Sequence, residues 1–85
     1  METTNAFRER LEHLLHDRFD GMDIDLGPLG QTGRLSGVLI WDGFRGLDFV
    51  DRQERVWSAI RDALKADALQ VSTLITLTPA EAAED

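Results

Sequence analysis

The chain has 85 residues, a length that allows one domain with a modest hydrophobic core. Sixteen acidic against nine basic residues give a formal net charge of −7, which argues against general coating of nucleic acids. The absence of cysteine excludes disulfides, thiolate nucleophiles and cysteine-ligated metal sites. The N-terminus lacks a secretory signal pattern and the longest strongly apolar run, VLIW, is too short to cross a bilayer. We therefore expect a cytoplasmic protein.

Residues 4–19 carry large apolar side chains at three- and four-residue spacing, which predicts a helix with one apolar face. Residues 22–26 alternate apolar and acidic side chains, as expected for a strand with one face on a core. The glycine-rich stretch GPLGQTG at 27–33 predicts a loop. Residues 34–41 predict a second strand, and the short loop favours its antiparallel pairing with the first.

The stretch DGFRGLD at 42–48 predicts a turn that leads into a second long helix, from residue 48 to about 66. The β-branched and aliphatic residues 69–78 predict a third strand. TPAE at 78–81 has the spacing of a helix capping box, with proline at the first helical position. Five large side chains around the turn and the second helix are expected in the core: Phe44, Leu47, Val50, Val56 and Trp57.

The resulting element order, α-β-β-(α)α-β-α, predicts a single α+β domain. In it, a three-stranded mixed sheet carries the two main helices on one face. The second and third strands are joined by the long helix, so we expect them to run parallel through a right-handed crossover. We place the domain at residues 1–80 and an acidic C-terminal tail at 81–85.

Two histidines are the first candidates for chemistry. His13 and His16 lie with Glu9 on the side of the first helix opposite its apolar face, a spacing that can present ligands to a metal ion. A solvated face with helical Glu–His pairs explains the same pattern, so we predict no metal site and no cofactor. The serines have no evident histidine partner, and we expect no enzymatic activity.

The stretch WDGFRGLDFVDRQERVWSAI, residues 41–60, resembles the signature of the BolA-like proteins. In that family a strand end is followed by a Phe-x-Gly turn, an Arg-His-Arg-x-Val-Tyr helix start and, later, a strand that closes on Thr-Pro. LTPAE at 77–81 resembles this chain end. Eight residues fall on the family's positions in the first stretch: Asp42, Phe44, Gly46, Leu47, Val50, Arg52, Val56 and Trp57.

The resemblance implies a fold close to the type II KH domain, and it implies two lines of function. BolA-like proteins partner monothiol glutaredoxins in iron–sulfur cluster delivery and iron regulation. Some members are linked to transcriptional control and the stress response through nucleic-acid binding.

The departures from the family pattern concern the residues that would bind a cluster. Gln53 stands where the family has the histidine of its Arg-His motif, and Glu54 stands at the next basic position. The family's histidine ligand near the start of the last strand is also missing, and the nearby residues here are Gln70, Val71 and Ser72. The 27–33 loop, which supplies a histidine or cysteine in cluster-binding members, contains neither. A glutamine amide is a poor substitute for imidazole or thiolate on iron.

The leading hypothesis is a non-enzymatic BolA-like adaptor, a divergent partner of monothiol glutaredoxins with weakened cluster ligation. Five residues are the predicted partner-binding set: Arg45, Arg52, Gln53, Arg55 and Gln70. Arg52 is expected to be the main exposed functional residue, and the alternative for the three arginines is ion pairing with Asp48 and Asp51.

Two alternatives remain at this stage. Nucleic acid can bind through a KH-like surface that uses Arg34, Arg45, Arg52 and Arg55, although the net charge and the lack of a basic Gly-x-x-Gly clamp disfavour it. A plain interaction module, such as a homodimer formed through a sheet edge, is the other alternative.

Overall fold

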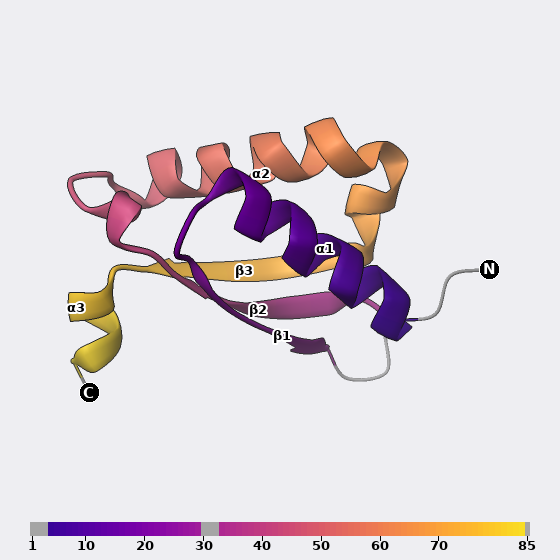
Figure 1. The fold of residues 1–85 in the computed structure, drawn as a ribbon, viewed down its shortest axis with the longest axis horizontal. Coiled ribbons are helices and arrows are strands. Elements are labelled where there is room, and N and C mark those ends of the chain that lie inside the picture. The colour runs from indigo at the N-terminus through magenta and orange to yellow at the C-terminus, as the bar shows by residue number, and fades with distance from the viewer. Residues whose placement is uncertain (1–3, 30–32, 85) are drawn as a thin grey trace.

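The computed structural model describes residues 4–29 and 33–84. Its element order matches the predicted one: a 3₁₀ segment stands at the short helical element expected before the long helix, and a second 3₁₀ segment follows that helix (Figure 1). The elements are α1 (Thr4–Arg18), β1 (Asp23–Pro28), β2 (Leu35–Ile40), η1 (Asp42–Phe44), α2 (Phe49–Leu64), η2 (Lys65–Gln70), β3 (Val71–Leu77) and α3 (Pro79–Ala83). Part of the predicted 27–33 loop, residues 30–32, lies outside the described residues.

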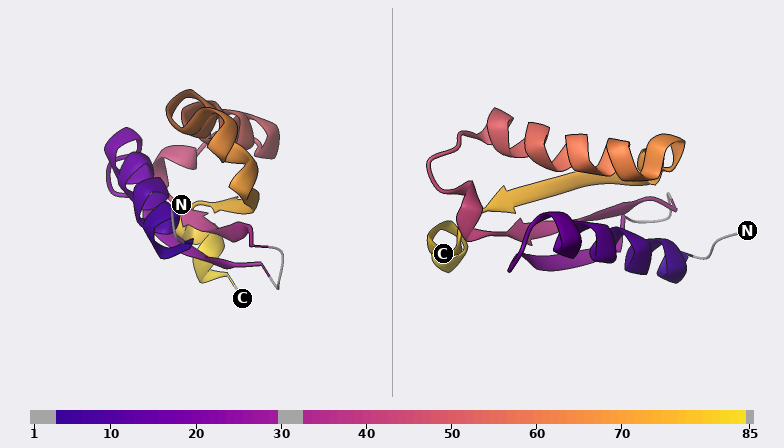
Figure 2. Two further views of the ribbon diagram at one scale, coloured as in Figure 1. Left: turned by 90° about the vertical axis from the view of Figure 1, so that its right-hand side faces the viewer. Right: turned by 45° about the horizontal axis from the view of Figure 1, so that its top comes forward.

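The three strands form one mixed sheet in the order β1-β2-β3. β1 and β2 are antiparallel, with Ile24 opposite Leu39. β2 and β3 are parallel, with Val38 opposite Ile75. Figure 2 shows α1 and α2 together on one side of the sheet, and α3 at its end. The predicted α+β class, the mixed sheet and the two helices on one face are therefore confirmed.

Local sequence signals set several of the helix ends. Asp48 caps α2 by accepting a hydrogen bond from the backbone N–H of Asp51. Thr78 and Glu81 form the predicted capping box at the start of α3. Gly21, which follows α1, has a φ angle of 81°, a conformation that glycine adopts without strain.

The C-terminal part of α2 departs from the prediction. Lys65 has a φ angle of 55°, in the left-handed region, and the helix ends at Leu64 instead of near residue 66. Residues 65–70 then form η2, so β3 begins at Val71 and not at residue 69. At the other end of β3, α3 includes Glu81, and the boundary that we placed between residues 80 and 81 falls inside this helix.

The core lies between the two helices and the inner face of the sheet. Its fully enclosed large side chains include Phe7, Leu11, Leu15, Leu35, Leu39, Phe44, Val56 and Ile60. The prediction that Val50 belongs to this core is wrong, because its side chain is 65% exposed. Successive helical residues are rotated by about 100°, so Val50 lies about 120° around α2 from the buried Val56. Trp57 is half-buried at the margin of the core.

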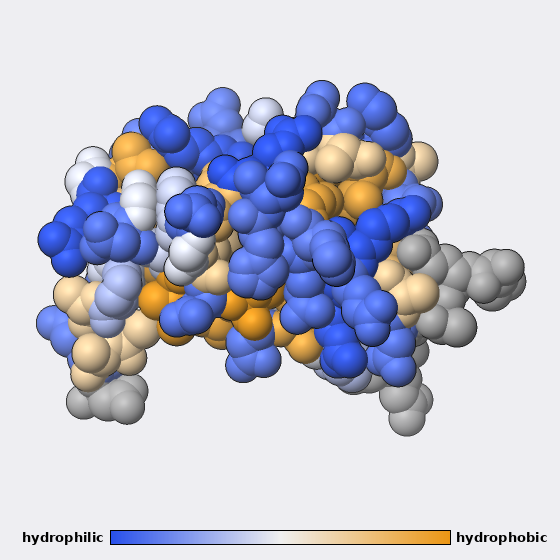
Figure 3. Space-filling model, in the orientation of Figure 1, coloured by the Kyte–Doolittle hydropathy of each residue, from blue (hydrophilic) through white to orange (hydrophobic). Residues whose placement is uncertain are grey.

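Hydrophilic residues cover most of the face that Figure 3 shows, and the hydrophobic residues there form patches between the elements. Within residues 4–29 and 33–84, no helix has both the length and the hydrophobicity needed to cross a bilayer.

Candidate partner-binding surface

Arg52 joins three elements at the end of the sheet where β3 terminates. Its Nη1 and Nη2 atoms donate to the two carboxylate oxygens of Glu81 in α3, at 2.6 and 3.1 Å. Nε donates to the carbonyl of Leu47 at 2.9 Å, and Nη1 also donates to the carbonyl of Thr76 at 3.3 Å. The guanidinium lies 5.8 Å from the ring centroid of Phe44, a cation–π contact. This arrangement uses both edges of the guanidinium, as bidentate arginine sites do.

The electrostatics of the pair follow from these contacts. Hydrogen bonds from Arg52, and then from the backbone N–H of Thr78, lower the pKa of Glu81 to about 2. The hydrogen bond with Glu81 raises the pKa of Arg52 in return. The side chain of Arg52 is only 12% exposed, so the expectation that it is exposed is wrong. Its carboxylate partner is Glu81, 29 residues further along the chain.

Gln53 binds the neighbouring part of β3. Its Nε2 atom donates to the carbonyl of Leu74 at 2.7 Å, and its Oε1 atom accepts a hydrogen bond from Trp57 Nε1 at 3.1 Å. β3 lies at an edge of the sheet, so carbonyls such as those of Leu74 and Thr76 need partners outside the sheet. We call Arg52, Gln53 and Glu81 the clamp, because these three side chains fasten α2 and α3 to that edge.

A second region lies at the other end of β3. The backbone N–H of Leu29 donates to the carbonyl of Arg34 at 2.9 Å, close to the β1–β2 connection. The Arg34 side chain then donates to the carbonyls of Leu69 and Val71 at 3.1 and 3.3 Å. These contacts bring Arg34 next to the backbone on either side of Gln70. We call Leu29, Arg34, Leu69 and Gln70 the tip.

The tip presents side chains to solvent. Leu69 is 76% exposed and Leu29 is 41% exposed. Gln70 is exposed between Leu69 and the first residue of β3. The tip therefore combines two apolar side chains with an amide and a guanidinium, a composition suited to a protein partner.

Gln53 and Gln70 do not lie together. Gln53 contacts Leu74, whereas Gln70 ends η2, just before β3. The three steps from Val71 to Leu74 alone span about 10 Å at roughly 3.3 Å per strand residue. Gln53 thus belongs to the clamp and Gln70 to the tip.

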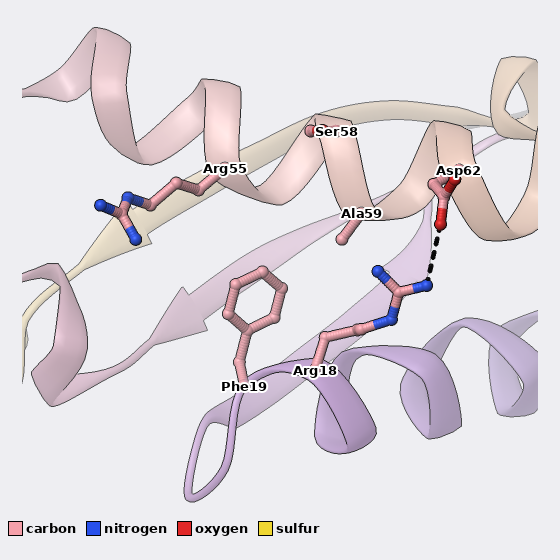
Figure 4. Close-up of a pocket in the computed structure, with 6 residues that line it drawn as sticks. All are labelled: Arg18, Phe19, Arg55, Ser58, Ala59 and Asp62. Carbon is pink, nitrogen blue, oxygen red and sulfur yellow. Dashed lines mark hydrogen bonds and ion pairs between the residues drawn. The ribbon is translucent and has the colours of Figure 1, made fainter.

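Arg45 and Arg55 lie in other places. Arg45 Nη2 pairs with Asp42 Oδ1 at 3.0 Å, and both side chains are 71% exposed. Arg55 is exposed and borders a groove of about 450 Å³ between α1 and α2. Figure 4 shows Arg55 reaching from α2 beside Phe19, while Arg18 pairs with Asp62. The five predicted partner-binding residues are therefore spread over several surfaces.

The histidine face of α1 lies apart from these regions. His13 and His16 are exposed and border a shallow groove of about 330 Å³ together with Glu9 and Glu12. In the part of the chain that the structure describes, no three histidine, cysteine, aspartate or glutamate residues are grouped to hold a metal ion.

Sequence reasoning missed Glu81 and Leu69 as parts of these regions. The TPAE motif indicated that Glu81 caps α3, which it does, but its second role depends on the position of α2. Leu69 was assigned to the third strand, where an aliphatic residue is expected to be buried. Only the 3₁₀ segment before Val71 turns it outward.

No protein-family model matches the sequence, and neither does any curated protein. Solved structures do match. BolA1 from Arabidopsis thaliana superimposes with a TM-score of 0.71 at 17% identity, over 95% of this chain and 98% of that one. The chain has the BolA fold. The BolA domain of SufE1 from Arabidopsis thaliana matches with a TM-score of 0.70 at 18% identity, over 86% of this chain and 92% of that domain.

A third structure, a bol-like protein from Babesia bovis, has a TM-score of 0.63 at 22% identity and covers 86% of this chain and 85% of its own. At these identities the likeness concerns the fold. It confirms the BolA-like architecture that the motif at residues 41–60 predicted, and it makes this chain a divergent example of it.

Proposed function

We propose that this protein is a non-enzymatic adaptor with a BolA fold that binds a monothiol glutaredoxin through its tip and supplies no ligand to an iron–sulfur cluster. The observation that carries the proposal is the exposed tip. There Arg34 binds the carbonyls on either side of Gln70, one of the residues near which the family resemblance places a histidine. The glutaredoxin partner itself is inferred from the motif resemblance together with the shared fold.

The chemistry of the two glutamines supports the loss of cluster ligation. A neutral amide binds iron far more weakly than imidazole or thiolate. The amide of Gln53 is also occupied at both ends, by the carbonyl of Leu74 and the indole of Trp57. Gln70 alone remains at an exposed position where a substituted side chain can reach a partner.

The alternative of nucleic-acid binding receives less support. The arginines named for it do not gather on one face, because Arg34 contacts η2 and β3, Arg45 pairs with Asp42, and Arg52 pairs with Glu81. Phosphate-backbone binding depends on clustered cations. A mobility shift of nucleic acid that this chain causes, and that weakens with added salt, would nevertheless support nucleic-acid binding.

The test is to mix the chain with a monothiol glutaredoxin, with and without a reconstituted cluster, and to measure complex formation by size-exclusion chromatography and calorimetry. We expect a 1:1 complex. Because this chain supplies no ligand to the cluster, the visible absorbance of the cluster should be the same with and without it. Leu69→Ala should weaken the complex, while Arg45→Ala, which alters an exposed residue away from the tip, should leave it unchanged.

A gain-of-function variant makes the test sharper. Gln70→His restores an imidazole at the exposed tip and should change the visible absorbance and circular dichroism of the cluster-loaded complex. Gln70→Asn keeps an amide and is the matched control. Failure of the wild-type chain to bind any monothiol glutaredoxin would refute the proposal, and so would a cluster spectrum that Gln70→His leaves unchanged.

A further inference from the structure

The outer side of α2 carries a stripe of apolar and charged side chains that the fold leaves partly exposed. Val50, Glu54, Trp57 and Arg61 follow one another at spacings of four, three and four residues, which places them along one line of the helix. Together with Phe49 and Gln53 they border a shallow groove of about 310 Å³. We call Val50, Glu54, Trp57 and Arg61 the α2 stripe.

Two features distinguish this stripe from an ordinary solvated helix face. Phe49 and Val50 are 68% and 65% exposed, so two large apolar side chains meet water side by side. Glu54 and Arg61 have exposed side chains that make no hydrogen bond or ion pair within the described residues. The stripe therefore offers apolar area together with one unpaired charge of each sign.

The middle of the stripe is held in place before any partner arrives. The indole N–H of Trp57 donates to Gln53 Oε1, and the amide of Gln53 is anchored on the carbonyl of Leu74 in β3. A tryptophan fixed in this way loses little side-chain freedom on binding, and tryptophan is among the residues that contribute most to interfaces.

The order of the charges identifies the partner. Glu54 lies on the N-terminal side of Trp57, and Arg61 lies on its C-terminal side. When two copies of such a stripe run antiparallel about a two-fold axis, the acidic half of each faces the basic half of the other. The same patch is then its own complement, as a two-fold interface requires.

We propose that two copies of this chain associate through their α2 stripes, antiparallel and with Trp57 near the two-fold axis. Glu54 pairs with Arg61 across the interface, and Val50 and Phe49 of each copy lie beyond that pair, against the C-terminal end of the other α2. A single helix stripe is smaller than the roughly 800 Å² per partner of a standard interface, so the dimer is weak and concentration-dependent. The tip and its glutaredoxin partner take no part in it.

Sedimentation velocity over a wide concentration range tests the dimer, at about 0.15 M salt, where charges more than about 8 Å apart are largely screened. The wild-type chain should pass from monomer to dimer as its concentration rises. Glu54→Arg alone and Arg61→Glu alone should each raise the dissociation constant by roughly tenfold or more, because each places like charges opposite one another.

The decisive sample is an equimolar mixture of these two single variants. It should restore association, because every reversed side chain then faces one of opposite charge, and the double variant should also dimerise. Arg55→Glu changes the net charge as much as Arg61→Glu does, but it lies towards α1 and should leave association unchanged. Val50→Ser, at an exposed position, should weaken association without charge reversal.

The proposal is overturned if the wild-type chain stays monomeric at every concentration. It is also overturned if the single reversals dimerise as well as the wild type, or if their mixture is no better than either variant alone. Far-ultraviolet circular dichroism of each variant shows that the fold is retained. Glutaredoxin binding is measured separately, so failure of either proposal leaves the other intact.

Discussion

The clamp and the tip lie at opposite ends of the same strand, and they differ in how their polar groups are satisfied. At the clamp, side chains from α2 and α3 meet edge carbonyls of β3, and Arg52 is 12% exposed. At the tip, Arg34 donates to the carbonyls of Leu69 and Val71, and the side chain of Leu69 is 76% exposed. The clamp therefore belongs to the architecture, whereas the tip leaves its side chains exposed.

This difference affects how the motif at residues 41–60 is read. Its arginine joins α2 and α3 to the edge of the sheet, so a role in the fold accounts for its presence. Gln53, in the motif, makes two hydrogen bonds inside the protein. Gln70, outside the motif, is exposed.

The largest effect is expected from Arg52→Ala. It removes four hydrogen bonds, leaves the carbonyls of Leu47 and Thr76 without this donor, and leaves Glu81 without its cation. The midpoint of urea unfolding should fall more than for any other substitution described below. Arg55→Ala, one turn along α2 and exposed, is the matched control. Equal midpoints for the two variants would mean that the clamp does not stabilise the fold.

Gln53→Ala should destabilise the protein by about 1–2 kcal/mol, because it leaves the carbonyl of Leu74 and the indole N–H of Trp57 without partners. Urea unfolding followed by tryptophan fluorescence measures the loss. Ser58→Ala changes an exposed position of the same helix and should have little effect. A loss no greater than that of the control would contradict the assignment of Gln53 to the clamp.

The pH dependence of stability reports on Glu81. Its ordinary pKa of 4.5 falls to about 2 in the folded protein. Its stabilising contribution is therefore complete above about pH 4.5 and is lost as the pH falls towards 2. Glu81→Gln should be less stable than the wild type at neutral pH and should lose less stability over this interval. Glu84→Gln, at the exposed end of α3, should follow the wild-type curve in an acid titration monitored by circular dichroism.

The smallest effect on stability is expected at the tip. Leu69→Ala and Gln70→Ala should each change the free energy of unfolding by less than about 0.5 kcal/mol, because both side chains are exposed. Thermal unfolding measures this change. A loss comparable to that of Gln53→Ala would show that the tip is part of the architecture, and the contrast between the two regions would fail.

Much of the fold could be read from the sequence because its signals are local. The apolar spacing of residues 4–19 and the acidic–apolar alternation of 22–26 are properties of single elements, and both elements form. Asp48 and Thr78 each accept a hydrogen bond from a backbone N–H in the first turn of their own helix. Their capping roles therefore depend only on neighbouring residues. The position of Val50 was misjudged because a helical stripe two or three residues wide does not specify which edge meets the core.

The candidate site was less predictable, for a physical reason. The sequence by itself determined that a strand, a glycine turn and a capped helix follow one another around Asp48, and that Thr78 and Glu81 begin a helix. Only the tertiary structure decided that Arg52 pairs with Glu81 and that Gln53 serves the carbonyl of Leu74. Those partners lie 29 and 21 residues away and meet only once α2 has packed along the edge of β3.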